Sequence, residues 1–129
     1  MKPIEFLMVF AIVVFCLPGI ATSDAAWIEN GVPVVTAPGL QWYHRVVPDG
    51  AGGMIAVWSD ERPGEFQNDI YAQRISDGGG VLWLLNGVSV CAADSVQWSP
   101  ELCTDGHNGA VMTWADYRNG AVDIYAQRI

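Results

Sequence analysis

The chain has 129 residues, which suits one small domain, and it carries 14 acidic against 6 basic side chains for a formal net charge of −8. Nucleic-acid binding needs clustered lysine and arginine to displace counterions, so this balance argues against a nucleic-acid partner. The carboxylates are spread along the chain, which indicates a solvated surface rather than an acidic tail.

The first residues have the three-part layout of a secretory signal peptide. Lys2 supplies a positive charge, residues 6–17 are an uninterrupted apolar run, and residues 21–23 are small enough for cleavage. A membrane anchor is the alternative, but about 12 apolar residues fall short of the roughly 20 that span a bilayer. Residues 1–23 are therefore predicted to be a signal peptide. Contact with a membrane is expected only through this segment, during export. The mature domain, residues 24–129, is expected to be secreted.

One heptad, Asp-Ile-Tyr-Ala-Gln-Arg-Ile, occurs at residues 69–75 and again at residues 123–129. Aligning the chain with itself extends the match to a period of about 54–56 residues, which is in the range of propeller blades. Matched positions include Trp27 and Trp83, Trp42 and Trp98, Trp58 and Trp114, Asp60 and Asp116, and Arg62 and Arg118. The domain is therefore an internal repeat, with units at about residues 26–75 and 82–129.

Each unit consists of short segments with strand character, separated by Pro-Asp-Gly, Pro-Gly or Gly-rich turns. The run at residues 53–58 is continuously apolar, which is typical of a strand buried on both faces. Strands are expected at residues 45–47, 53–58, 69–75 and 81–85 of the first unit, and at residues 101–104, 110–115 and 123–129 of the second.

Four short antiparallel strands per repeat describe a β-propeller blade. The predicted fold is all-β, two four-stranded blades of a partial propeller preceded by a signal-peptide helix. A β-sandwich of two four-stranded sheets is the alternative. The second unit lacks the match of its fourth strand, which lies at the N-terminus as residues 26–28. Stacked repeats usually need three or more units, so the expected partners are further blades of a longer protein, truncated after Ile129, or further copies of this chain.

The pattern Gly-Gly-x-x-x-x-Trp-x-Asp-x-Arg, then Asp-Ile-Tyr-Ala-Gln-Arg, then Leu-Trp-x-x-x-Gly-Val resembles a repeat of large secreted bacterial β-propeller-like proteins. It is carried by Gly52-Gly53, Trp58, Asp60, Arg62, residues 69–74, Leu82-Trp83 and Gly87-Val88. The second unit departs from it at Asn108-Gly109. The resemblance implies propeller architecture and a place outside a bacterial cell or on its surface. It implies no activity.

The charged and aromatic residues of the motif are expected to be structural. A feature present in every repeat is usually architecture, because an active site is normally built once. The set comprises Trp58, Asp60, Arg62, Asp69, Tyr71 and Arg74, with Trp114, Asp116, Arg118, Asp123, Tyr125 and Arg128. The Asp and Arg of Trp-x-Asp-x-Arg are expected to form ion pairs or turn caps. Arg74 and Arg128 lie inside strands, and Asp60 or Asp116 is the expected partner of such an arginine.

Two thiols remain in the mature chain, Cys91 and Cys103. Export would allow one disulfide between them. The alternative is a pair of free, buried thiols, because both cysteines stand opposite valines in the repeat alignment. No metal site is expected, since neither histidine has ligand spacing with another His or Cys, and residues 105–109 lack the carboxylates of a calcium loop. No cofactor is expected.

The sequence favours a non-catalytic binding or scaffold module, with an extracellular protein or glycan as ligand. The six tryptophans could stack on sugars, although their matched positions favour a packing role. One alternative is a fragment of a secreted, sialidase-like propeller glycosidase, but Ser-x-Asp-x-Gly-x-Thr-Trp boxes are absent. Another is a structural segment of a surface layer or adhesin. No catalytic residue is assigned.

Overall fold

The computed structural model describes residues 27–129, and this part of the chain is all-β, as predicted. The predicted signal peptide, with its helix, lies outside the described residues. Residues 27–129 contain no helix long and apolar enough to cross a membrane.

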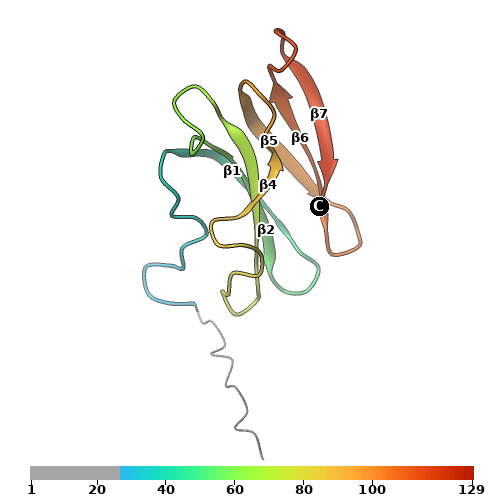
Figure 1. Cartoon of the computed structure of the whole chain (residues 1–129). Coiled ribbons are helices and arrows are strands. Elements are labelled where there is room, and N and C mark those ends of the chain that lie inside the picture. The colour runs from blue at the N-terminus through green and yellow to red at the C-terminus, as the bar shows by residue number, and fades with distance from the viewer. Residues whose placement is uncertain (1–26) are drawn as a thin grey trace, which may run out of the picture.

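Seven strands form two antiparallel sheets (Figure 1). The first sheet has the order β1 (Gln41–Pro48), β2 (Met54–Asp60), β3 (Asp69–Ile75) and β4 (Val88–Cys91). The second has the order β5 (Gln97–Thr104), β6 (Ala110–Asp116) and β7 (Asp123–Arg128). The apolar run that predicted a strand buried on both faces is β2, in which every residue after Met54 is buried.

The predicted strand at residues 81–85 is wrong. Val81 forms only an isolated bridge with Ile75, and the chain then turns through Asn86 and Gly87, both with positive φ. The fourth strand is β4, which starts at Val88. The apolar residues that suggested a strand here are largely at the surface, with Leu85 82% exposed. Likewise, residues 27–40 contain no strand, and Gly31 closes a turn onto the carbonyl of Ile28.

The core lies where one face of the first sheet packs against the second sheet. Alternation along the strands turns Val57 and Ala72 toward the second sheet, and Met112 and Trp114 toward the first. All four side chains are at most 4% exposed. Burying a large apolar side chain contributes about 1.5–3 kcal/mol, so this contact is the main source of sheet-to-sheet stability.

The first two strands pair in the same register in both sheets. Gln41 lies opposite Asp60 and Gln97 lies opposite Asp116, and each register then shifts at a bulge. Tyr43 and Ser99 lie within these bulges, with φ of 52° and 50°. A bulge bends its strand and redirects the side chains beside it, and in both sheets it follows directly after a paired tryptophan, Trp42 in β1 and Trp98 in β5.

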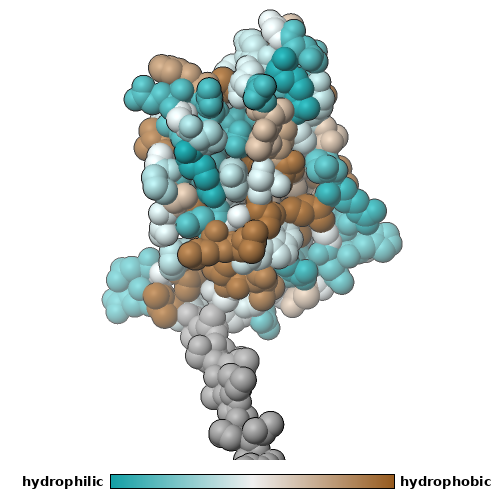
Figure 2. Space-filling view, viewed as in Figure 1, coloured by the Kyte–Doolittle hydropathy of each residue, from teal (hydrophilic) through white to brown (hydrophobic). Residues whose placement is uncertain are grey.

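Exposed apolar side chains follow the connection between β3 and β4. Figure 2 shows brown, hydrophobic surface gathered across the lower middle of the molecule, where this connection runs in Figure 1. Leu82, Leu84 and Leu85 are 52%, 71% and 82% exposed. Part of the apolar side-chain surface of this segment is therefore exposed to solvent instead of buried in the core.

Candidate functional site

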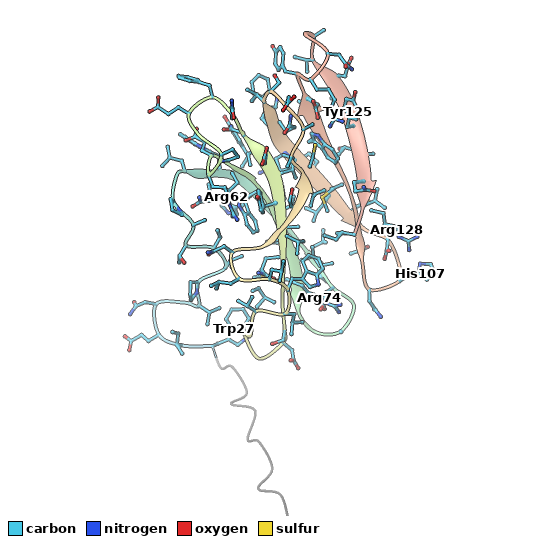
Figure 3. All side chains as sticks on the ribbon, viewed as in Figure 1. Trp27, Arg62, Arg74, His107, Tyr125 and Arg128 are labelled. Carbon is cyan, nitrogen blue, oxygen red and sulfur yellow. The ribbon has the colours of Figure 1, made fainter. Side chains whose placement is uncertain are left out.

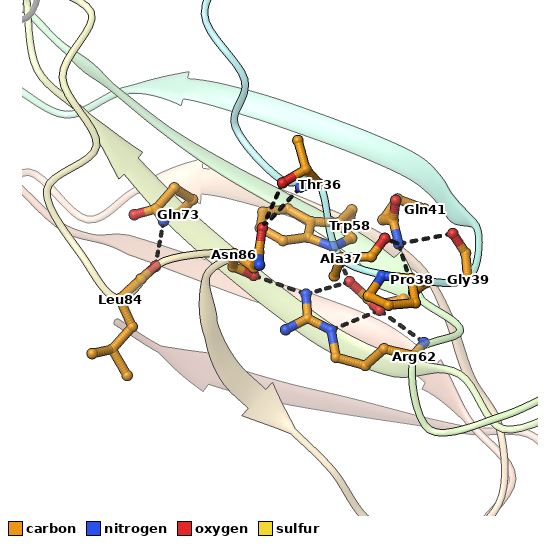
Figure 4. Close-up of polar contacts among 11 residues, drawn as sticks. Thr36, Ala37, Pro38, Gly39, Gln41, Trp58, Arg62, Gln73, Leu84 and Asn86 are labelled. Atoms are coloured by element: carbon orange, nitrogen blue, oxygen red, sulfur yellow. Dashed lines mark hydrogen bonds and ion pairs between the residues drawn. The ribbon is translucent and has the colours of Figure 1, made fainter.

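The carboxylate of Asp60 is the centre of a small polar cluster at the end of β2. Figure 4 shows Trp58, Arg62 and Asn86 of this cluster. It accepts hydrogen bonds from the Trp58 indole at 2.7 Å, from the Arg62 backbone N–H at 2.9 Å, and from Arg62 Nε and Nη2 at 2.9 and 2.6 Å. Burial raises the pKa of the Asp60 carboxyl, but the hydrogen bonds from Arg62 and Trp58 outweigh it and hold the pKa below its usual value. The carboxylate is completely buried and fully bonded.

The Arg62 side chain makes further contacts besides those with Asp60. Its guanidinium carbon lies 3.7 Å from the centre of the Tyr71 ring, and Nη2 also donates to the carbonyl of Asn86 at 2.8 Å. A planar, delocalised cation suits this combination of paired hydrogen bonds and stacking. The cluster thereby ties the end of β2 to β3 and to the turn before β4.

The second sheet repeats the cluster. Asp116 accepts from the Trp114 indole at 3.0 Å and from Arg118 N and Nε at 2.9 and 3.0 Å. Arg118 lies over the Tyr125 ring, 3.9 Å from its centre. The hydrogen-bonded Arg118 side chain holds the pKa of the Asp116 carboxyl well below its usual range. Here Nη2 of Arg118 donates to Cys91 Sγ at 3.0 Å rather than to a turn carbonyl.

The strand arginines have partners that the sequence did not predict. Arg74 binds Asp49 at 2.7 Å, and Arg128 binds Asp105 at 2.6 Å, so neither Asp60 nor Asp116 is their partner. Both aspartates begin a β-turn and also accept backbone N–H groups inside it. The hydrogen bond from the His107 backbone N–H, with the Arg128 side chain, lowers the pKa of Asp105 to about 2.

Asp69 and Asp123 occupy matched positions but differ in surroundings. Asp69 lies opposite Asp60 in the β2–β3 register and is 8% exposed. Burial raises the pKa of the Asp69 carboxyl, and the nearby Asp60 charge adds to the effect. Asp123 is exposed and accepts a hydrogen bond from Asn119 at 3.0 Å.

These contacts leave the Asp60 and Asp116 carboxylates little capacity for proton transfer. A general base needs a free lone pair within reach of a substrate proton, and the Asp60 and Asp116 carboxylates are both buried and saturated. Among residues 27–129, no group of three or more His, Cys, Asp or Glu side chains is placed to hold a metal ion.

A more accessible candidate lies where β1 meets β5. Trp42, Tyr43 and Trp98, together with Glu61 and Asn68, line a hollow of about 200 Å³. Trp42 and Tyr43 are 42% and 54% exposed, whereas the side-chain oxygen of Asn68 is buried and has no hydrogen-bond partner among the described residues. Aromatic faces beside a carboxylate and an amide can contact a ligand that has both apolar and hydroxyl-bearing faces.

Sequence reasoning identified only part of this hollow. The matched tryptophans Trp42 and Trp98 were recognised, but Tyr43 was not, because no sequence pattern marked the bulge that turns it outward. The bulge itself belongs to both units, with φ of 52° at Tyr43 and 50° at Ser99, so its backbone conformation is architecture rather than a mark of function. The second unit has Ser99 at the matched position, so the aromatic hollow is built once rather than in every repeat.

Both cysteines are free thiols in the structure, so the disulfide considered for Cys91 and Cys103 is absent. Cys91 is buried at the end of β4, beside Arg118. Cys103 was expected to be buried but is exposed on β5, opposite Val111.

Comparison of the chain with models of protein families, with curated proteins and with solved structures found no match.

Proposed function

We propose that the chain is a non-catalytic binding or scaffold module exported from a bacterial cell, built from two neighbouring blades of a β-propeller-type array. One observation carries the non-catalytic part: in both sheets the Trp-x-Asp-x-Arg side chains satisfy one another. Asp60 and Asp116 each hold an arginine and a tryptophan in the same arrangement. A group committed to the same internal contacts in each sheet is architecture.

Blade architecture is supported by the face-to-face packing of two antiparallel sheets that share a register. Blades of this kind pack a sheet face on a sheet face and leave short edges. The first strands, β1 and β5, lie beside each other, and Arg45 on β1 bonds Glu101 on β5 at 2.9 Å. Both partners of that pair are exposed, so it positions the strands more than it stabilises them.

The binding surface we propose is the hollow of Trp42, Tyr43 and Trp98, and its ligand class is a saccharide. Pyranose rings have C–H faces that lie on aromatic rings and hydroxyls that bond to carboxylates and amides, which the hollow supplies as Glu61 and Asn68. Exposed aromatic residues supply large contact area with little loss of side-chain freedom.

A glycan array with the purified protein, followed by calorimetry on any hit, tests the binding role. Trp42→Ala is expected to weaken saccharide binding at least tenfold. Phe66→Ala is the matched control, because Phe66 is an aromatic residue 83% exposed that does not line the hollow. Equal binding by the two variants, or no binding by the wild type, would remove the saccharide assignment.

A turnover assay tests the non-catalytic assignment. The protein is expected to release no product from aryl glycosides, including sialosides. Turnover that Asp60→Asn abolishes without changing the circular dichroism spectrum would reverse the assignment.

Export has its own test. The mature protein is expected to begin between residues 24 and 26, as determined by intact mass. Retention of residues 1–23 in the extracellular protein would contradict the predicted signal peptide.

A further inference from the structure

The two sheets are joined by a segment that serves both of them. Residues 83–91 bind the first sheet: Leu84 O accepts from Gln73 Nε2 at 2.7 Å, and Val88 pairs with Ala72. Residues 92–97 then bind the second: Val96 O accepts from the backbone N–H of Tyr117, directly after β6, at 3.0 Å. The segment thus supplies the fourth strand of the first sheet and then leads into the first strand of the second sheet.

Residues 27–40 have the same local structure. Asn30 and Gly31 have φ of 70° and 93°, close to the 65° and 90° of Asn86 and Gly87. Each glycine N–H closes a turn onto the carbonyl three residues earlier, at 3.0 Å for Gly31 and 2.9 Å for Gly87.

The second half of residues 27–40 makes the same contacts within its own chain as residues 92–97 make. Gln41 Nε2 donates to Ala37 O at 3.3 Å, as Gln97 donates to Ala93. Leu40 O accepts from Glu61 N at 2.9 Å, as Val96 O accepts from Tyr117 N at 3.0 Å. The first half, residues 27–35, pairs with no strand among residues 27–129.

Among residues 27–129, β7 of the second sheet pairs with β6 only, so its other edge is open. Gln127 Oε1 accepts from the Arg128 backbone N–H at 3.0 Å, the same self-contact that Gln73 makes with Arg74 at 2.9 Å. In β3 this contact aims the Gln73 amide at Leu84 O. Gln127 makes the self-contact but has no such carbonyl acceptor for its amide nitrogen among residues 27–129, and it is exposed where Gln73 is completely buried.

The outer face of the second sheet shows the same difference. Ile124 is 72% exposed, whereas its match in the first sheet, Ile70, is 0% exposed. Val111 is 36% exposed, whereas its match, Ile55, is 0% exposed. Ile70 belongs to the buried cluster that includes Cys91 of β4 and Met112 and Trp114 of the second sheet. An open sheet edge beside such a face is a template for strand addition.

We propose that residues 27–35 of one copy of this chain add to β7 of a second copy, in the register that β4 has on β3. Val32 then lies opposite Ala126, and Val35 lies opposite Ile124, as Val88 and Cys91 lie opposite Ala72 and Ile70. Pro33 takes the place of Ser89 on the outermost strand, where proline is tolerated.

The donor and acceptor must belong to different copies. Trp27 donates its indole N–H to the Asp77 carbonyl at 2.8 Å, at the turn that follows β3. Figure 3 places Trp27 at the lower left, while Tyr125 and Arg128 of β7 lie on the right, on the far side of the first sheet. The contact is therefore heterologous, head to tail, and each copy both donates and accepts.

Solution mass by light scattering tests this assembly, which does not depend on saccharide binding. The wild type is expected to have a multiple of the single-chain mass at micromolar concentration. Ile124→Glu and Gly31→Ala are expected to have the single-chain mass with unchanged circular dichroism spectra. Gly31 has nothing within 4 Å in its own chain, but a Cβ at the matching Gly87 would lie 2.7 Å from Trp58.

Gly120→Ala is the matched control, because Gly120 has φ of 82° and likewise nothing within 4 Å. It is expected to assemble as the wild type does. A single-chain mass for the wild type, or an assembly that Ile124→Glu and Gly31→Ala leave intact, would overturn the proposal.

Cross-linking tests the register directly. In a Cys103→Ser background, Val32→Cys protein mixed with Ala126→Cys protein is expected to form a disulfide-linked pair, because opposed strand residues lie about 4.5–5.5 Å apart, within disulfide range. Val122→Cys, exposed but outside the predicted pairing, is the control. Equal cross-linking to residue 122 would contradict the register.

Discussion

The guanidinium of Arg62 lies on the ring of Tyr71, 3.7 Å from its centre, while its nitrogens hold the buried Asp60 carboxylate. The Tyr71 ring in turn stacks near the Trp58 indole at 6.4 Å. The cation is therefore enclosed by an aromatic face, a carboxylate and a backbone carbonyl. Such a site selects arginine by shape as well as by charge.

Arg62→Lys is expected to lower the free energy of unfolding by about 1.5–3 kcal/mol, because an ammonium cannot keep the paired bonds to Asp60, the bond to Asn86 O and the ring contact together. Urea unfolding measures the difference. Arg45→Lys is the control: its pair with Glu101 is exposed on both sides, so a change within about 0.5 kcal/mol is expected. Similar losses for both variants would contradict a geometric requirement for Arg62.

Asp60→Ala is expected to cost about 3–5 kcal/mol, because it leaves the Arg62 charge and the buried Trp58 N–H without their acceptor. Thermal unfolding with calorimetric enthalpies gives the value. Asp94→Ala, at an exposed position of the link before β5, serves as the control. A loss below about 1 kcal/mol for Asp60→Ala would mean that solvent replaces the carboxylate, contrary to its complete burial.

Asp69→Asn is expected to stabilise the protein at pH 7. Burial, with the neighbouring Asp60 charge, raises the folded-state pKa of Asp69 above its unfolded value, so the ionised carboxylate destabilises the fold at neutral pH. As pH falls through the folded-state and then the unfolded-state pKa, both states become protonated and the gain disappears. Melting temperatures from pH 7 down to pH 3 follow this change.

Asp123→Asn is the matched control for that series, because Asp123 is exposed and an amide oxygen can still accept from Asn119. A small, pH-independent change is expected. A stabilisation by Asp69→Asn that persists undiminished at pH 3 would show that the effect is not one of charge.

The sequence predicted the strands whose apolar pattern or repetition was strong and missed features that depend on tertiary contacts. The repeated heptad gave the bounds of β3, and the apolar run gave most of β2. The fourth strand was misplaced because Leu82, Leu84 and Leu85 are apolar yet exposed. A Cβ at Gly87 would lie 2.7 Å from Trp58, and this close tertiary approach at the turn before β4 is not visible in the sequence pattern.

The candidate site was predicted unevenly for a similar reason. The pairing of Asp60 with Arg62 follows from their spacing, two residues apart at a strand end. The partner of Arg74 does not, because Asp49 belongs to a turn and was recognised only as a turn former. The placement of Tyr43 depends on a β-bulge that cannot be predicted from the residue types in β1.

Thiol labelling without prior reduction distinguishes the two cysteines of the described chain. Cys103 is exposed and is expected to react with iodoacetamide within minutes in the native protein, whereas Cys91, buried beside Arg118, is expected to react only on unfolding. Peptide mass spectrometry locates each label. Reduction and unfolding of a second sample is the control, and it should add no label beyond that of unfolding alone. Reaction of Cys91 and Cys103 only after reduction would show that a disulfide joins them in solution, contrary to the expected free thiols.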